Sequence, residues 1–109
     1  MDEIDDSSAS VGSADVSIDP AGIAVITLRG EIDMSNVESL RDVIAPVLEK
    51  TPERVDFDLS GLGFMDSSGI ALLLRVAATA KTVHVREPSA LLRRLIEATG
   101  LSDVLPIDP

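Results

Sequence analysis

The stretch D-F-D-L-S-G-L-G-F-M-D-S-S-G-I-A-L-L-L, residues 56–74, decides the fold of this chain. Apolar and polar side chains alternate over residues 55–59, which is the period of a strand with one buried face. The glycines of the G-L-G run are expected to loosen the chain. A helix that is apolar nearly all round should then begin around residues 66–68 and run to about residue 80. The stretch therefore predicts a strand, a turn of small polar residues and a buried helix.

The rest of the chain predicts further strands and helices in alternation. Two segments rich in β-branched residues flank the turn-forming run P-A-G and indicate a hairpin, which Gly30 should end. Ser35 and Glu38 have the spacing of a capping box, so a helix should start there. Pro46 inside that helix is expected to kink it or to disturb its last turn. The expected strands are near residues 15–18, 23–28, 55–59, 82–86 and 104–107, and the expected helices near 35–50, 66–80 and 89–99.

This alternation predicts the fold class α/β, with a small mixed β-sheet and helices packed largely on one side. The chain of 109 residues fits a single domain. Its hydrophobic content of 45% suits a core that needs no disulfides or metals for support. Residues 1–14 are acidic and poor in large apolar side chains, and we expect them to form a disordered leader. We place the folded domain at residues 15–109.

Composition excludes several classes of function. The chain has no cysteine and a single histidine, so it cannot form a disulfide, a thiolate metal site or a multi-histidine metal centre. A net charge of −10 repels phosphate backbones, and an aromatic content of 2% offers no platform for stacked bases, so direct nucleic-acid binding is not expected. The charge is uneven, because residues 1–20 hold six acidic and no basic side chains. No secretory or membrane-spanning segment is evident, and we expect a soluble cytoplasmic protein.

The residues give little support to catalysis or metal binding. Ser67 lies at a strand-to-helix turn, but a nucleophile elbow needs glycine two residues to either side, and Met65 occupies the first of those places. His84, the only histidine, falls on a predicted strand, where a structural role is the simpler interpretation. Asp56 and Asp58 share one face of a strand, and a solvated face explains them better than a cation site. We therefore expect no enzyme, no metal site and no cofactor.

The turn Asp66-Ser67-Ser68 carries the strongest candidate for a function. Small polar residues at the start of a helix are typical caps, and capping alone would account for them. The functional alternative is a serine hydroxyl presented at an exposed helix N-terminus as a phosphorylation acceptor, where free N–H groups and the helix dipole favour a phosphate. Asp66 would repel the phosphate, so the modification would leave a strongly negative spot. Chemistry alone leaves both interpretations open.

The run F-M-D-S-S-G within residues 56–74 closely resembles the signature of anti-sigma factor antagonists, whose fold is the STAS domain. A second match is L-R-G-E-I-D at residues 28–33, and the resemblance covers about residues 15–107. It implies a bacterial, cytoplasmic regulator of stress-response transcription. Such a protein binds an anti-sigma factor, which is itself an ATP-binding serine kinase, and so frees the sigma factor. A serine phosphatase reverses the phosphorylation that the kinase performs.

The resemblance also implies roles for individual residues. The family's kinase phosphorylates the serine directly after the aspartate, here Ser67, and this modification switches binding off. We expect a capping role for Ser68. An alternative within the family is a scaffold or sensor domain of a larger signalling assembly, or a regulator that binds a small ligand such as a nucleotide. The expected partner-binding residues are Asp33, Gly63, Met65, Asp66, Ser67, Ser68 and Ile70, of which Gly63, Met65 and Ile70 would supply apolar contact.

Overall fold

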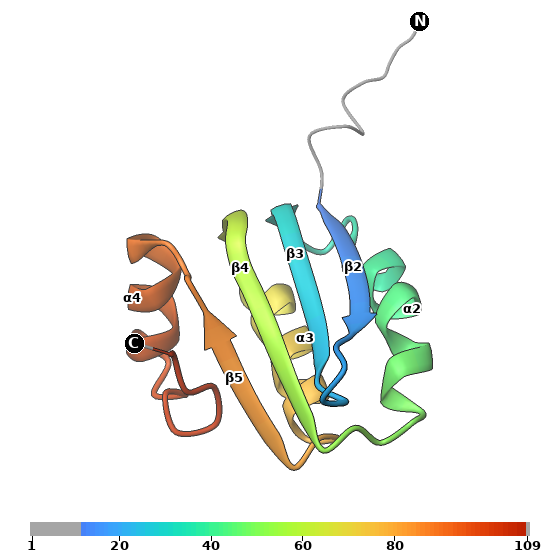
Figure 1. Cartoon of the computed structure of the whole chain (residues 1–109). Helices are drawn as coiled ribbons and strands as arrows, with labels where there is room; N and C mark the ends of the chain where they lie inside the picture. Colours follow the sequence, from blue (N-terminus) through green and yellow to red (C-terminus); the bar gives the residue numbers. More distant parts are fainter. Residues whose placement is uncertain (1–11, 109) are drawn as a thin grey trace, which may run out of the picture.

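The computed structural model describes residues 12–108. Within this range, one mixed sheet has the strand order β2-β3-β4-β5 (Figure 1). β2 runs antiparallel to β3, and the other two pairs are parallel. The predicted α/β class with a small mixed sheet is therefore confirmed. The strands are β2 Ser13–Ile18, β3 Ala24–Ile32, β4 Arg54–Met65 and β5 Thr82–Arg86, and the helices are α2 Val37–Leu48, α3 Ser67–Ala77 and α4 Ala90–Ala98.

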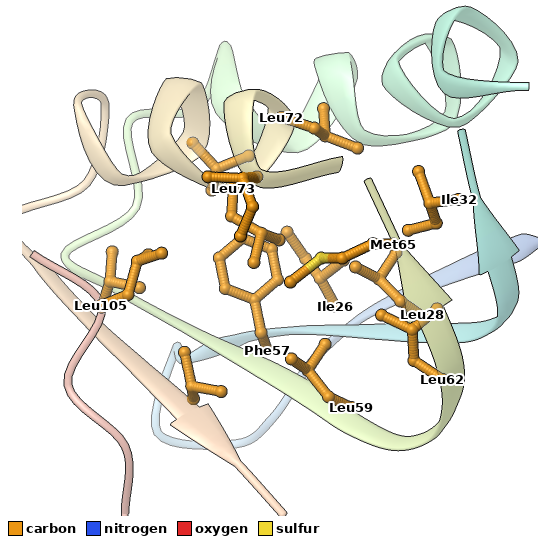
Figure 2. Packing of buried hydrophobic residues seen from close by; sticks show 14 of the residues in the cluster. Ile26, Leu28, Ile32, Phe57, Leu59, Leu62, Met65, Leu72, Leu73 and Leu105 are labelled. Carbon is orange, nitrogen blue, oxygen red and sulfur yellow. The ribbon is translucent and has the colours of Figure 1, made fainter. Parts of the chain in front are cut away.

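The helices and the sheet enclose one hydrophobic core. α2 and α3 lie against the same face of the sheet, and α4 lies beside β5 at one end (Figure 1). Side chains alternate between the two faces of a strand, so the apolar set of each strand points toward the helices. Phe57 of β4 is fully buried at the centre of this core, and Leu73 of α3 lies over it (Figure 2). Leu92 and Ile96 bring α4 into the same cluster.

β4 does not end before its glycines. It spans 12 residues and passes through the whole G-L-G run, so the expectation that these glycines loosen the chain is wrong. Its pairing with β3 shifts register twice, once after Thr27 and once after Gly30, and each shift places one extra residue in β4. Gly30 does not end β3 either, because its φ of +82° lets the strand bend there and continue. The two bulges set the spacing of the buried side chains at this end of β4, which are Leu59, Leu62 and Met65.

The predicted capping box at the start of α2 is wrong. The N-cap is Asn36, which makes no side-chain capping hydrogen bond. Ser35 instead donates its backbone N–H and its hydroxyl to Oδ1 of Asp33, at 2.9 and 2.5 Å. Glu38 accepts a hydrogen bond from Arg41. A carboxylate two residues before Ser35 thus forms an Asx-type turn that competes with the box. α2 starts at Val37 as a result.

Other local predictions have mixed outcomes. β5 has the predicted bounds, Ser89 caps α4 by accepting from the Leu92 N–H, and Gly100 ends that helix region with a φ of +76°. The predicted last strand is reduced to one isolated bridge, between Val85 and Ile107. The predicted disorder of the leader falls mainly on residues 1–11, which lie outside the described residues, and β2 already begins at Ser13.

The helices also differ slightly from expectation in length. Pro46 lies inside α2, and the helix ends two residues later, at Leu48. α3 ends at Ala77, a few residues before its predicted end. Among the residues that the structure describes, no helix combines the length and the apolar character that crossing a bilayer requires.

The sheet face opposite the helices holds an ion cluster around Asp56, which has no exposed surface. Arg54 donates from Nε to Oδ1 at 2.7 Å and from Nη2 to Oδ2 at 3.1 Å, and Arg86 donates from Nε and Nη2 to Oδ2 at 3.0 and 2.6 Å. Burial raises the pKa of the Asp56 carboxyl, but the hydrogen bonds and charges of both arginines outweigh burial and hold that pKa below its ordinary value. The prediction of a solvated face is therefore wrong for Asp56.

The second carboxylate of this face is held separately. Asp58 accepts from the backbone N–H and the hydroxyl of Ser60, at 3.0 and 2.7 Å. These hydrogen bonds lower the pKa of Asp58. The two carboxylates thus bind different partners rather than converging. Over residues 12–108, no cluster of three or more potential metal ligands is present.

The Asp56 cluster makes a pH-dependent contribution to stability. Near neutral pH we expect Asp56→Asn to lower the free energy of unfolding by about 1–3 kcal/mol, because two partly exposed arginines lose their charged partner. Since the native pKa lies below the unfolded value of about 4, this contribution is present above that pH and is lost as the pH falls through the native pKa. Urea unfolding of both proteins across this range should show a gap that narrows on acidification. A gap that widens would contradict the assignment.

Candidate functional site

The candidate site lies where β3 and β4 end side by side. Ile32 and Met65, the last residues of the two strands, are register partners. The backbone N–H of Asp66 donates to the carbonyl of Ile32 at 3.1 Å, which extends the pairing one residue beyond β4. Asp33 and Asp66 directly follow these two strand ends. The parallel pairing therefore brings together the two segments in which the sequence places site residues.

Asp66 is the N-cap of α3. Its Oδ1 accepts from the backbone N–H of Ser68 at 2.8 Å and, more weakly, from that of Gly69 at 3.4 Å. The hydroxyl of Ser68 donates to the same oxygen. The hydrogen bond from the Ser68 hydroxyl is the largest cause that lowers the pKa of the Asp66 carboxyl. Desolvation opposes it, and the backbone N–H groups of Ser68 and Gly69 lower the pKa further. Asp66 is thus an anionic cap that satisfies free donors of the helix.

The two serines of the turn differ in what their hydroxyls do. Ser68 is half-buried and its hydroxyl donates to Asp66. Because Asp66 is itself the cap, the capping role expected for Ser68 is wrong. Ser67, the first residue of α3, is exposed, and its hydroxyl makes no hydrogen bond to any described residue from 12 to 108. Ser67 therefore presents an accessible oxygen at the start of a helix.

Gly69 permits the close approach of α3 to the end of β4. Gly69 is buried, and a Cβ added to it would lie 2.7 Å from Cβ of Met65 and 3.3 Å from Cγ2 of Ile32. Both neighbours are themselves fully buried and cannot move away freely. The glycine of the D-S-S-G run is therefore required by packing, and it fixes where Ser67 sits relative to the sheet.

Asn36 holds the neighbouring loop in place, and sequence reasoning missed it. Its side chain is almost fully buried, with 8% exposure. Oδ1 accepts from the backbone N–H of Asp33 at 3.1 Å, and Nδ2 donates to the carbonyl of Glu31 at 2.8 Å. This amide joins the end of β3 to the start of α2 and so positions Asp33 beside the start of α3. The sequence signal that could have found it is an Asn three residues after Asp33, directly before the apolar helix pattern.

The apolar residues at the site differ from those expected. Met65 is fully buried and Ile70 is 7% exposed, so neither offers surface that a docking protein could cover. Met65 lies inside the core, close to its register partner Ile32 (Figure 2). Gly63 is exposed, as expected, but it has no side chain. The exposed apolar side chains next to the site are Phe64, at 45%, and Met34, at 81%.

Alternation along β4 explains this exchange. Met65 lies eight residues after the inward-facing Phe57 and Phe64 lies seven after it, so Met65 faces the helices and Phe64 faces solvent. The two bulges shift the phase in turn and cancel by Met65, and between them they bury Leu62. Phe64 was not identified because the sequence predicted that this strand ends near residue 59.

His84 is far from the candidate site. Its register partner on β4 is Asp56, far from the strand end at Met65. The residues of β3 that pair with Asp56 and Met65 are seven positions apart, roughly 23 Å at strand spacing. Nδ1 of His84 lies 2.6 Å from Oδ1 of Asp108, in the segment that follows α4. The only histidine therefore cannot serve as a base for Ser67, and the site lacks the constellation of a serine hydrolase. What the site offers is an accessible hydroxyl, two neighbouring carboxylates and two exposed apolar side chains.

Comparisons with known proteins agree with this architecture. The family model described as Mlab, STAS domain, matches residues 14–106. The anti-sigma F factor antagonist of Lysinibacillus sphaericus is 37% identical over 82 residues, which cover 71% of this chain and 70% of that protein. The crystal structure of an anti-sigma factor antagonist from Mycobacterium paratuberculosis has a TM-score of 0.82 at 28% identity and covers 92% of this chain and 87% of that one. The anti-sigma factor antagonist SpoIIAA in its unphosphorylated form has a TM-score of 0.71 at 25% identity, with 89% of each chain covered.

The packing at Gly69 can be tested by adding one methyl group. We expect Gly69→Ala to lower the free energy of unfolding by about 1–3 kcal/mol, because the new Cβ overlaps Met65 in a core without free space. Gly63→Ala is the matched control, since its Cβ would meet only the carbonyl of Gly30, at an ordinary 3.6 Å. Thermal and urea unfolding of both variants measure the difference. Equal stability of the two variants would show that close packing does not fix the start of α3.

Proposed function

The chain belongs to the STAS domain family, and we propose that it is an anti-sigma factor antagonist switched by phosphorylation of Ser67. In its unphosphorylated form it binds an anti-sigma factor and so releases the sigma factor. The partner is an ATP-binding serine kinase that modifies Ser67, and a serine phosphatase restores the binding form. The protein itself is not an enzyme in this proposal, and it acts in the cytoplasm beside these partners.

The single observation that carries this proposal is the contrast between the two serines. Ser67 is exposed with an unengaged hydroxyl, whereas Asp66 holds the hydroxyl of Ser68. A kinase needs an oxygen that its active site can approach and that need not break an existing hydrogen bond. Of the two serines, Ser67 meets both conditions, so the geometry supports Ser67 as the acceptor.

The surface around Ser67 has the character of a protein docking site. Asp33 and Asp66 supply charge, and the exposed side chains of Met34 and Phe64 supply apolar area. Methionine and aromatic residues are enriched where proteins bind one another. Partners of standard size cover roughly 800 Å² on each side, which is enough to include all of these residues at once.

Phosphorylation would change the charge at the centre of this surface. A phosphate adds about −1.5 to −2 charges, beside the anionic Asp66. Covering that charge in an interface costs desolvation, and it repels any acidic or electron-rich group that faced the hydroxyl. A penalty of about 3 kcal/mol weakens binding more than a hundredfold. A switch of this kind requires no rearrangement of the fold.

The alternative of a small-ligand regulator has weaker support. The groove next to Ser68 has a volume of about 200 Å³, and the hollow of about 340 Å³ beside His84 is lined by none of the predicted site residues. Sites for nucleotide-sized ligands are usually about 300–1,000 Å³ and enclose most of the ligand. A scaffold or sensor role within a larger signalling assembly is favoured by no particular observation, since such a role does not need an accessible serine.

A phosphomimetic variant tests the switch. We expect Ser67→Asp to abolish measurable binding of the organism's anti-sigma factor in calorimetry, while thermal unfolding stays close to that of the wild type. The fold should tolerate this change because a carboxylate at the first helical position suits the helix dipole. Ser67→Ala is the control, and it should bind as the wild type does. Wild-type affinity of Ser67→Asp would refute the mechanism.

The acceptor can be identified directly. Incubation with the anti-sigma factor kinase and ATP, followed by phosphopeptide mapping, should place the phosphate on Ser67 alone. Ser68→Ala should still accept phosphate, although its helix start is weakened because Asp66 loses one donor. Ser67→Ala should accept none. Phosphate on Ser68 in the wild-type protein would overturn the assignment.

A further inference from the structure

A groove lies between α2 and α3 and opens beside the candidate site. Its volume is about 200 Å³. Ser68 lines one end, so the groove is continuous with the turn that presents Ser67. Arg75 lines it eight residues after Ser67 on α3, a rise of roughly 12 Å along the helix. A protein that covers Ser67 over a standard interface area would therefore cover this groove too.

Two arginines and one carboxylate, Glu38, line the groove, so its charge balance is positive, in contrast to the acidic rim at Asp33 and Asp66. Arg41 contributes from α2, where its Nη2 donates to Oε1 of Glu38 at 2.9 Å. Glu38 is largely exposed, and exposed ion pairs of this spacing contribute only about 0.2–0.5 kcal/mol to stability. Arg41 can therefore exchange Glu38 for a carboxylate of a partner. Arg75 is exposed and forms no ion pair with any residue of the described range 12–108.

The chain carries a net charge of −10, so two guanidinium groups at one groove differ from the charge of the protein as a whole. Arginine binds carboxylates with two parallel hydrogen bonds, which suits recognition of an acidic side chain. Apolar side chains also line the groove, among them Ala71 and Leu72. A short segment that carries one or two carboxylates beside an apolar side chain would match both the charge and the shape.

We propose that this groove receives an acidic segment of the anti-sigma factor, with Arg41 and Arg75 as its charged contacts. The inference rests on the proposed function and adds a second contact to the same interface. Surfaces that carry both signs of charge fix the orientation of a partner better than a surface of one sign. The acidic rim and the basic groove together orient the partner so that its kinase site faces Ser67.

Charge reversal tests the groove. We expect Arg75→Glu to raise the Kd for the anti-sigma factor at least tenfold, and Arg75→Gln to raise it less. Arg94→Glu on α4 is the matched control, because it is exposed, changes the net charge equally and lies at the other end of the sheet (Figure 1). The control should change the Kd less than twofold. Circular dichroism and thermal unfolding verify that each variant is folded.

Three outcomes of this measurement are decisive. Unchanged binding by Arg75→Glu, with binding still lost in Ser67→Asp, overturns the groove but leaves the proposed function standing. Equal losses in Arg75→Glu and Arg94→Glu also overturn it, because they would reflect net charge alone. Failure of the wild type to bind any anti-sigma factor of the organism overturns the proposed function, and this inference with it.

Crosslinking identifies the occupant of the groove. Ala71 is exposed and lines the groove, so a photoreactive residue placed there should capture whatever segment binds. We expect mass spectrometry of the complex to find a peptide of the anti-sigma factor that contains Asp or Glu. A captured peptide without an acidic residue would overturn the proposal. Capture of residues 1–11 of this same chain would overturn it as well and would assign the groove to the acidic leader instead.

Discussion

The carboxylate of Asp66 decides which of two adjacent serine hydroxyls is available. By accepting from the backbone N–H groups of Ser68 and Gly69 and from the Ser68 hydroxyl, it starts α3 and engages Ser68 in the same step. Ser67 is left exposed and without a partner among the described residues. A capping interaction, ordinary in itself, thereby creates a single accessible acceptor. The proposed regulation depends on this division of roles between the two serines.

The sheet places that acceptor among the residues that a partner would contact. Parallel pairing of β3 with β4 brings Asp33 beside Asp66. The side-chain amide of Asn36 holds the Asp33 loop through its hydrogen bonds to the backbone of Asp33 and Glu31. Alternation along β4 points Met65 into the core and Phe64 out to solvent. Gly69 lets α3 approach closely enough for the turn to sit at the sheet end. Local features of the backbone therefore determine which residues are exposed around Ser67, and no domain movement is needed.

Features that depend on a few neighbouring residues could be predicted from the sequence. The bounds of β5, the Ser89 cap and the Gly100 stop are of this kind, as is the D-S-S-G turn. Features that depend on partners distant in sequence were missed. Asp56 is buried because parallel register places Arg86 within reach, and Leu62 is buried because β4 bulges against β3. The capping box failed for a local reason, because Asp33, two residues before Ser35, binds the Ser35 hydroxyl.

Phosphate on Ser67 is expected to act through local charge and not to refold the protein. The most direct test compares the unmodified protein with the phosphorylated protein. The anti-sigma factor should be titrated by calorimetry with the unmodified protein and with protein phosphorylated on Ser67, and amide NMR spectra of both forms compared. We predict at least about a hundredfold loss of affinity on phosphorylation, with shifted amide signals confined to the start of α3 and the loop at Asp33. Affinities within a few-fold of each other, or signals that shift throughout the core, would contradict this account.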